Sequence, residues 1–242
     1  MNIKYKLPKY NRILLKISGE SIKGTKKYGI SSKFLFKISK DIKKIIKLGV
    51  QIGIVIGGGN LFRGSLLSKK GINHIISDQI GMLSTIINSL AMFDILNKQK
   101  IKTCLMSSLP IHNICRSYDR QKALKLLKKK YVVIFSGGTG NPLFTTDSAA
   151  CLKGIEINAD IILKATKVEG VYSSDPLKCS KAIIYKKLLY KEILSKKLEI
   201  MDLSAFILAK NHNIPIRIFN INKKSILYNI LLGKQEGTLI TN

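Results

Sequence analysis

The sequence is short of acidic residues and of arginine. Among its 242 residues, 14 are Asp or Glu and 42 are Lys or Arg, which gives a formal net charge of +28. Such an excess suggests a polyanionic partner. Only five of the 42 are Arg, however, whereas proteins that read nucleic acids rely on the bidentate fork of arginine. Lys, Ile and Asn fill 91 positions. All three have AT-rich codons, so we interpret most of the charge as mutational drift.

Cysteine and histidine are scarce and scattered. No two of the four Cys form a C-x-x-C pair, and the three His are scattered along the chain. Zinc sites of these patterns are therefore excluded. Idle cysteines are typical of a reducing compartment, so we expect a cytoplasmic protein. The cysteines are Cys104, Cys115, Cys151 and Cys179.

Long apolar runs, internal repeats and biased linkers are also missing. No stretch approaches 18 apolar residues and residues 1–10 hold no apolar run, so we expect neither a membrane span nor a signal peptide. A hydrophobic content of 45% argues against disorder. We predict a single domain over residues 1–242, in which residues 1–11 are a flexible N-terminal extension.

Short apolar runs alternate with longer amphipathic ones along the chain. This alternation predicts a mostly parallel sheet that is covered by helices on both faces. The expected strands are 12–17, 51–56, 103–106, 131–136, 161–164 and 215–219. The expected helices are 31–48, 78–98, 120–130, 146–157, 202–211 and 224–232.

Glycine follows three of the expected strands. Gly19 follows the first, Gly57–Gly59 the second, and Gly137–Gly140 the strand that ends at Ser136. Glycine lets the backbone turn sharply, and its N–H groups next to a helix N-terminus form a cradle for anions. Ligands of such folds bind beyond the carboxyl ends of the strands. Three such ends on one rim predict a phosphate site.

Two common nucleotide-binding signatures are absent. The sequence has no G-x-x-x-x-G-K-[ST] segment. The G-x-G-x-x-G pattern fails at Phe62, after Gly57 and Gly59, and at Leu143, after Gly138 and Gly140. A P-loop or a simple dinucleotide-binding fold is therefore disfavoured.

Five segments carry a family resemblance. They read KISGE from Lys16, GGGNLFRG from Gly57, TGNPLFTTD from Thr139, KATKVEGVY from Lys164 and MDL from Met201. Together, and in this order, they resemble the bacterial uridylate kinase (UMP kinase) family of the amino-acid kinase superfamily, from about residue 12 to the C-terminus.

The resemblance implies a fold and a reaction. The fold would be a three-layer αβα sandwich with a mostly parallel central sheet. The reaction would transfer the γ-phosphoryl group of ATP to UMP with Mg²⁺, giving UDP and ADP in pyrimidine nucleotide biosynthesis. The family also implies a homohexamer, with GTP as an activator and UTP as an inhibitor. No membrane and no specific nucleic acid is expected as a partner.

The resemblance also implies roles for particular residues. Lys16, Arg63 and Asp147 would be catalytic, and the metal ligands stay open. ATP would contact Lys16, Ile17, Ser18, Gly19, Gly59, Arg63, Thr166, Tyr172 and Asp175. UMP would contact Gly58, Asp78, Thr139, Gly140, Asn141, Pro142, Leu143, Phe144, Thr145 and Thr146. The stretch linked to GTP activation aligns with Gly24, Thr25, Lys26, Lys27, Tyr28 and Gly29.

The chemistry of four residues suggests roles for them, and three of the four carry more than one interpretation. The ammonium of Lys16, at a strand end, can reach a transferring phosphoryl group. Asp78 can accept from ribose hydroxyls, or cap the helix that it opens, or both. Asp147 can orient Lys16 or a water on Mg²⁺, or serve only the electrostatics of a helix start. Lys164 can add charge near the phosphates or be a surface lysine.

Two rival functions remain open. Another amino-acid kinase would act on a carboxylate such as aspartate or acetylglutamate, but the segment 139–146 looks like the UMP version. A nucleic-acid-binding protein would gather arginine and aromatic residues on one surface. The charge is instead spread along the chain, with local density in residues 1–50 and 120–130.

Overall fold

The strands of the protein form one sheet at the centre of the molecule. The computed structural model describes residues 7–62, 67–68, 71–174, 179, 181–196, 198 and 200–242. The strands are β1 (Arg12–Ile17), β2 (Gln51–Ile56), β3 (Thr103–Ser107), β4 (Arg116–Ser117), β5 (Val132–Ser136), β6 (Ile161–Thr166), β7 (Lys187–Leu189), β8 (Ile216–Asn220) and β9 (Thr238–Thr241). Their order is β4-β3-β5-β2-β1-β6-β8-β9-β7, and within this sheet only β8 and β9 pair antiparallel.

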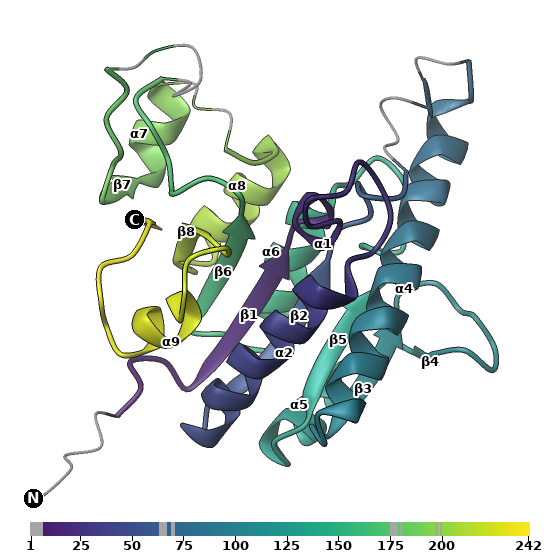
Figure 1. The fold of residues 1–242 in the computed structure, drawn as a ribbon. Helices are drawn as coiled ribbons and strands as arrows, with labels where there is room; N and C mark the ends of the chain where they lie inside the picture. Colours follow the sequence, from purple (N-terminus) through teal and green to yellow (C-terminus); the bar gives the residue numbers. More distant parts are fainter. Residues whose placement is uncertain are drawn as a thin grey trace, which may run out of the picture.

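Helices cover both faces of the sheet (Figure 1). One face carries α2 (Ser32–Lys47), α4 (His74–Lys98) and α9 (Ile226–Leu231), whose buried side chains join one hydrophobic cluster. The other face carries α5 (Arg120–Lys128), α6 (Thr146–Glu156), α7 (Tyr190–Ser195) and α8 (Leu203–Asn211), which share a second cluster. The short α1 (Gly19–Ile22) follows β1. The predicted three-layer αβα sandwich with a mostly parallel sheet is confirmed.

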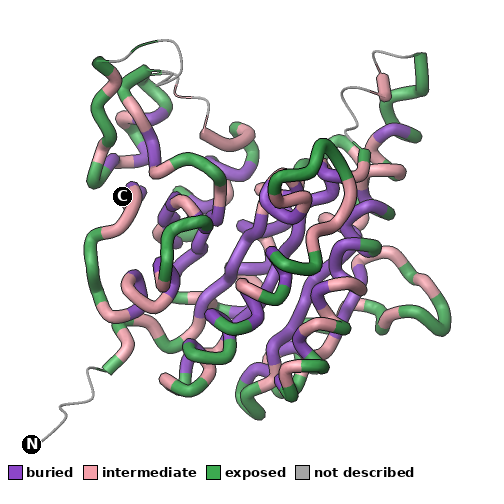
Figure 2. The backbone as a smooth tube through the Cα atoms, in the orientation of Figure 1, coloured by how far each residue is buried: buried purple, intermediate pink, exposed green. Residues whose placement is uncertain are grey.

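Burial follows this layering (Figure 2). The central strands β1, β2 and β5 are buried along almost their whole length, as expected for parallel strands with helices on both sides. In β1, Ile13, Leu15 and Ile17 face the first cluster, and Leu14 faces the second. The side chain of Lys16 therefore leaves the sheet on the α6 side.

Helix α4 begins earlier than the sequence pattern predicted. Its N-cap is Asn73, whose side chain accepts from the backbone N–H of Ile75 at 2.9 Å and of Ile76 at 3.4 Å. Asp78 lies in the second turn of the helix, so its interpretation as a helix cap is wrong. Asn73 caps the helix five residues before the predicted start at Asp78, and the periodicity of residues 78–98 does not locate this cap.

The same helix bears on the expectation that the chain has no membrane span. Among the described residues, α4 alone is long and apolar enough to cross a membrane by length and composition, and 44% of its apolar window is buried in the fold. A helix in the core of a globular fold can meet the same criterion of length and apolar composition. The side chains of Met92 and Leu96 are fully buried in the first cluster.

The start of the described chain is attached to the domain. The backbone N–H of Lys9 donates to the Leu231 carbonyl at 2.8 Å, and that of Asn11 to Asp160 Oδ2 at 2.6 Å. Tyr10 packs against the first cluster. Of the predicted extension, residues 1–6 lie outside the described residues.

Candidate active site

Two lysines stand side by side at the carboxyl ends of the central strands. Lys16 of β1 and Lys164 of β6 are paired in register, so their side chains leave the sheet on the same face. Each residue is only 8% exposed. Two ammonium groups so close together repel each other in a poorly solvated place. The fold therefore has to supply a negative charge between them.

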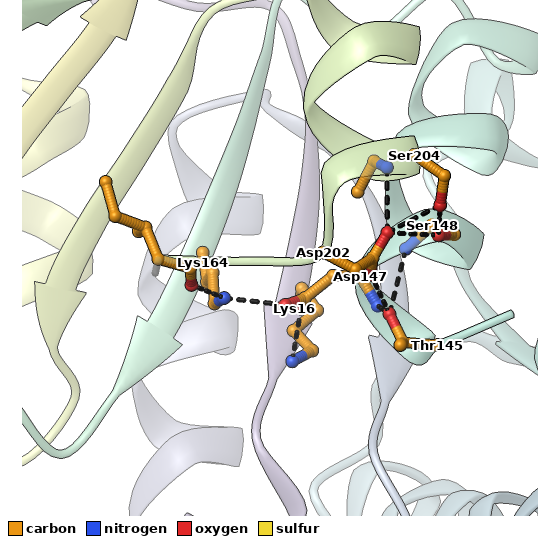
Figure 3. A network of polar contacts seen from close by, with 9 residues as sticks. Lys16, Thr145, Asp147, Ser148, Lys164, Asp202 and Ser204 are labelled. Atoms are coloured by element: carbon orange, nitrogen blue, oxygen red, sulfur yellow. Dashed lines mark hydrogen bonds and ion pairs between the residues drawn. The ribbon is translucent and has the colours of Figure 1, made fainter. Parts of the chain in front are cut away.

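Asp147 supplies that charge. It lies in the first turn of α6, and its two oxygens each face one lysine (Figure 3). Oδ1 is 2.6 Å from Lys16 Nζ, and Oδ2 is 2.6 Å from Lys164 Nζ. Lys164 Nζ also donates to the Ile200 carbonyl at 2.6 Å. The arrangement carries one net positive charge, which suits the binding of a phosphate group.

The environment sets the charge states of this group. Burial alone would raise the pKa of Asp147, but Lys16 and Lys164 outweigh it, and the pKa is lowered. Burial lowers the pKa of Lys164, and the attraction of Asp147 opposes that effect. Asp147 is therefore an ionised acceptor at neutral pH. The interpretation that Asp147 orients Lys16 is supported by this geometry.

Glycine lets the first two loops approach each other. A Cβ atom on Gly19 would lie 2.6 Å from the Gly59 nitrogen and 2.9 Å from the Gly57 carbonyl oxygen. A Cβ atom on Gly58 would lie 2.7 Å from the Gly81 carbonyl oxygen of α4. Real Cβ atoms do not come so close to backbone atoms. These glycines therefore hold the turn after β2 between α1 and α4.

The third loop needs glycine for its backbone conformation. Gly137, Gly138 and Gly140 have φ angles of 75°, 61° and 91°, in the left-handed region that residues with a Cβ rarely adopt. Gly137 also donates its N–H to Thr85 Oγ1 of α4 at 2.9 Å. Two of the predicted glycine loops thus contact the same helix, and the rim predicted from the sequence is present in the structure.

A cavity of about 370 Å³ opens between these loops and α4. Four residues expected to contact UMP line it: Gly58, Asp78, Phe144 and Thr146. Thr146 is the first residue of α6, so the N-terminal end of this helix, which favours negative charge, lies at the cavity. The cavity is lined by Gly58, Gly59, Phe62, Ser77, Asp78, Gly81, Met82, Thr85, Gly138, Phe144 and Thr146.

Asp78 holds the loop that closes this cavity. Its Oδ2 accepts from the Leu143 N–H at 2.9 Å and lies 3.4 Å from His74 Nδ1. Leu143 has a φ angle of 69°, which is costly for a leucine. The hydrogen bond offsets part of this cost. Asp78 therefore fixes the loop and at the same time faces the cavity.

Two other residues expected to contact UMP line a different cavity. Thr139 and Asn141 line a second cavity, of about 300 Å³, on the α8 side of the loop. Thr139 Oγ1 accepts from the Asn141 N–H at 3.2 Å and donates to the Asn141 carbonyl at 3.1 Å, so it stabilises its own turn. Phe144 lines both cavities.

The residues expected on the ATP side are only partly described. Thr166 ends β6, and its hydroxyl donates to the Val168 carbonyl at 3.0 Å. Tyr172 is half-buried and forms a bridge with Ile184. The predicted roles of Arg63 and Asp175 fall outside the described residues.

Comparison with known proteins decides the family. Residues 11–220 match the model of the amino acid kinase family. The chain belongs to the amino acid kinase family. It is 60% identical to a uridylate kinase of Buchnera aphidicola subsp. Schizaphis graminum, with 96% of each chain covered. It is 52% identical to the uridylate kinase of Escherichia coli K12, with 97% of each covered. A solved UMP kinase from Bacillus anthracis superimposes with a TM-score of 0.93 at 38% identity, over 96% of both chains.

In this amino acid kinase, the segment 24–29 is attached at its end to the glycine turn. Asn60 Nδ2 donates to the Gly29 carbonyl at 2.9 Å, and the Gly29 N–H donates to the Asn60 carbonyl at 3.0 Å. Asn60 and Asn88 of α4 form a buried amide pair, and Asn88 Nδ2 also donates to the Gly57 carbonyl at 2.8 Å. Lys26, Lys27 and Tyr28 are exposed.

Sequence reasoning missed several residues of the kinase site. Asn88 and Thr85 look like ordinary polar interruptions of an apolar helix, and only the fold places them under the glycine loops. Lys164 was not missed: the sequence left it open between a charge near the phosphates and a surface lysine, and the structure buries it beside Lys16. The partners of Asp202, described below, are not visible from the sequence.

The arginines of this kinase argue against a nucleic-acid surface. Arg12, Arg120 and Arg217 each donate to a backbone carbonyl of the fold, namely that of Ile157, Glu156 and Glu236. Each of these contacts ties part of a guanidinium group to the fold and leaves fewer of its donors for phosphate or bases. The observation agrees with the interpretation of the net charge as drift.

Proposed function

We propose that the protein is an ATP-dependent UMP kinase that transfers the γ-phosphoryl group of ATP to UMP and releases UDP and ADP. The observation that carries phosphoryl transfer is the pair of buried lysines bridged by Asp147 next to the glycine loops. The identity of the acceptor is supported by the uridylate kinases that match over nearly the full chain.

The acceptor needs no strong base on the protein. The second pKa of a phosphate monoester lies near 6, so the attacking oxygen of UMP is already ionised at neutral pH. That oxygen forms a bond to the γ-phosphorus as the bond to the bridging oxygen of ADP breaks. The work of the protein is to align the two nucleotides and neutralise charge. Lys16 and Lys164 neutralise the transferring group, and Asp147 holds the two ammonium groups in place between its oxygens.

The two nucleotides meet at the glycine turn. UMP occupies the cavity of about 370 Å³, with its phosphate toward Thr146 and Gly58 and its ribose toward Asp78. ATP lies on the other side of Gly59, over the segment 16–19 and toward Thr166 and Tyr172. Arg63 and Asp175 keep their proposed roles at the phosphates and on the ATP side.

Mg²⁺ fits this site as an ion carried by the nucleotide. Across the described ranges, no group of three or more His, Cys, Asp or Glu side chains is placed to hold a metal ion. Mg²⁺ usually keeps several waters and binds through one or two carboxylates and substrate phosphates. Asp147 would orient a water molecule on the ion. The bound ion would add to the neutralisation of phosphate charge.

Assembly, regulation and location form part of the same proposal. The protein acts in the cytoplasm as a homohexamer with GTP as activator and UTP as inhibitor. Exposed apolar side chains along α4 support contact between copies: Ile76, Leu83 and Ile87 are 47%, 48% and 47% exposed. The four cysteines are free, which suits a reducing compartment.

A panel of acceptors tests the proposed reaction. With ATP and Mg²⁺, we expect UMP to be converted to UDP, and aspartate and acetylglutamate to be left unchanged. CMP should be a poorer acceptor. dUMP lacks the 2′-hydroxyl that Asp78 accepts from, so its kcat/KM should fall by roughly 10- to 100-fold, the value of a hydrogen bond to a charged group. Phosphorylation of a carboxylate, or no UDP from well-folded protein, would contradict the proposal.

A further inference from the structure

Asp202 gathers more polar contacts than its role as a helix cap requires. Its Oδ1 accepts from the Ala205 N–H at 2.8 Å, which caps α8, and also from the hydroxyls of Ser204 at 2.6 Å and Ser148 at 2.8 Å. Its Oδ2 accepts from Thr145 Oγ1 (Figure 3). One carboxylate thus ties α8 to the N-terminal end of α6.

The contact with Thr145 controls the first turn of α6. A hydroxyl has one hydrogen to donate and two lone pairs to accept with. Thr145 donates its hydrogen to Asp202 and accepts from the backbone N–H groups of Asp147 at 3.0 Å and Ser148 at 3.4 Å. The carboxylate of Asp202 therefore turns the lone pairs of Thr145 toward the helix. Asp147, which bridges the two lysines, is the first residue held in this way.

The same segment touches the site at a second point. The carbonyl of Ile200, two residues before Asp202, accepts from Lys164 Nζ at 2.6 Å. Lys164 is thus held between Asp147 and Ile200. A shift of the segment 200–202 would move the partners of both charged groups together.

The electrostatics agree with a fixed acceptor. Burial alone would raise the pKa of Asp202, but the hydrogen bonds from Ser204, Thr145 and Ala205 lower it. The carboxylate is therefore ionised at neutral pH, and it can only accept hydrogen bonds. None of these hydrogen bonds joins Asp202 to a glycine of the loops that line the cavity, so any role of Asp202 in the reaction is indirect.

We propose that Asp202 is a positioning residue of the kinase, which sets the place of Asp147, and through it of Lys16 and Lys164, by orienting the Thr145 hydroxyl. This inference rests on the proposed function for its effect on turnover. The contact pattern itself is independent of the substrate.

The substitution Asp202→Asn separates positioning from capping. Oδ1 accepts three hydrogen bonds and Oδ2 one, so the amide oxygen of the variant takes the Oδ1 place and still caps α8. Its NH₂ group then faces Thr145 and competes for the lone pairs that hold α6. We expect kcat at saturating ATP and UMP to fall about 10- to 100-fold, the cost of a small misplacement of reacting groups. The melting temperature should stay close to that of the unmodified protein.

Two matched controls accompany the variant. Asp119 caps α5 through the Lys122 N–H at 2.9 Å, away from the site, so Asp119→Asn should leave kcat unchanged. Thr145→Ser keeps the hydroxyl and should keep most of kcat, whereas Thr145→Val should lose it. Adding Asp202→Asn to Thr145→Val should cost no more than about twofold, because both act through one hydroxyl.

Amide hydrogen exchange gives a readout that does not depend on the reaction. In Asp202→Asn, the amides of Asp147 and Ser148 should exchange faster, and that of Ala205 at its original rate. Unchanged exchange at Asp147 and Ser148, or a kcat equal to that of Asp119→Asn in an enzyme that makes UDP, would overturn the inference. If the unmodified protein makes no UDP while the exchange result holds, the proposed function fails and the positioning contact stands.

Discussion

Lys16→Met is expected to lower kcat for UDP formation by about 10²- to 10³-fold, the usual cost of removing one preorganised group that stabilises transition-state charge. The ammonium of Lys16 is buried and held at 2.6 Å from Asp147. It meets the transferring group without reorganisation, in a place where water does not screen it. Methionine keeps the length and the apolar stem of the side chain, so the fall in kcat measures the contribution of the ammonium charge alone.

The fold should tolerate this change. Asp147 keeps Lys164 at 2.6 Å, so the buried carboxylate does not become an unpaired charge. Steady-state kinetics and thermal melting of the same preparation are the measurements. Lys98→Met is the matched control, because Lys98 is an exposed lysine that pairs with Asp94 on the surface of α4. A Lys16→Met enzyme with normal kcat would remove Lys16 from the mechanism.

Asp147→Asn should damage both turnover and stability. It leaves two buried ammonium groups in register on neighbouring strands with no counter-charge. Breaking a buried ion pair by removing one partner costs roughly 3–5 kcal/mol, which corresponds to a fall in melting temperature of about 6–20 °C for a chain of this size. kcat should fall by at least about 10²-fold, because the ammonium groups move apart.

The deficit of Asp147→Asn should depend on pH in a defined way. The folded-state pKa of Asp147 is lowered from 3.8, so its contribution is fully present above that unfolded value and is lost as the pH falls through the lower folded value. The deficit should therefore be full at neutral pH and shrink in strong acid. In the variant, the pKa of Lys164, already lowered by burial, falls further, so raising the pH above neutral should restore part of the stability.

Thermal melts over a range of pH values test this prediction. Asp94→Asn removes an exposed carboxylate that pairs with Lys98 on α4, and an exposed pair is worth about 1 kcal/mol or less. That control should therefore melt within a few degrees of the unmodified protein. If the melting temperature of Asp147→Asn also stayed within a few degrees of that of the unmodified protein, Asp147 would not be the counter-charge that holds Lys16 and Lys164.

The sequence was informative where local rules decide the outcome. The alternation of apolar and amphipathic runs predicted the central strands and both helix layers, because each segment had to bury one face. Glycines after β1, β2 and β5 predicted the rim, since only glycine allows the close approaches at Gly19 and Gly58. The family motifs added the reaction and the substrates.

Other features depend on tertiary contacts that a local pattern does not carry. Strands β4 and β7, at the two edges of the sheet, and β9, next to β7, have only two to four residues and are stabilised by pairing and not by propensity. The start of α4 was misplaced because the cap depends on the side chain of a single residue, Asn73, and not on apolar periodicity. The bridge of Asp147 between Lys16 and Lys164 requires the register of two strands and the position of α6, and the contacts of Asp202 join segments more than fifty residues apart in sequence.

The most direct test of the account follows the phosphoryl group itself. ATP with a radioactive γ-phosphoryl group is mixed with UMP, Mg²⁺ and excess protein, and the products are separated within one turnover. We expect the label to appear in the β-phosphate of UDP as fast as ATP is consumed, with no labelled protein, and we expect Lys16→Met to slow this single step. Label that stays in ATP, passes to water or remains on the protein would contradict it.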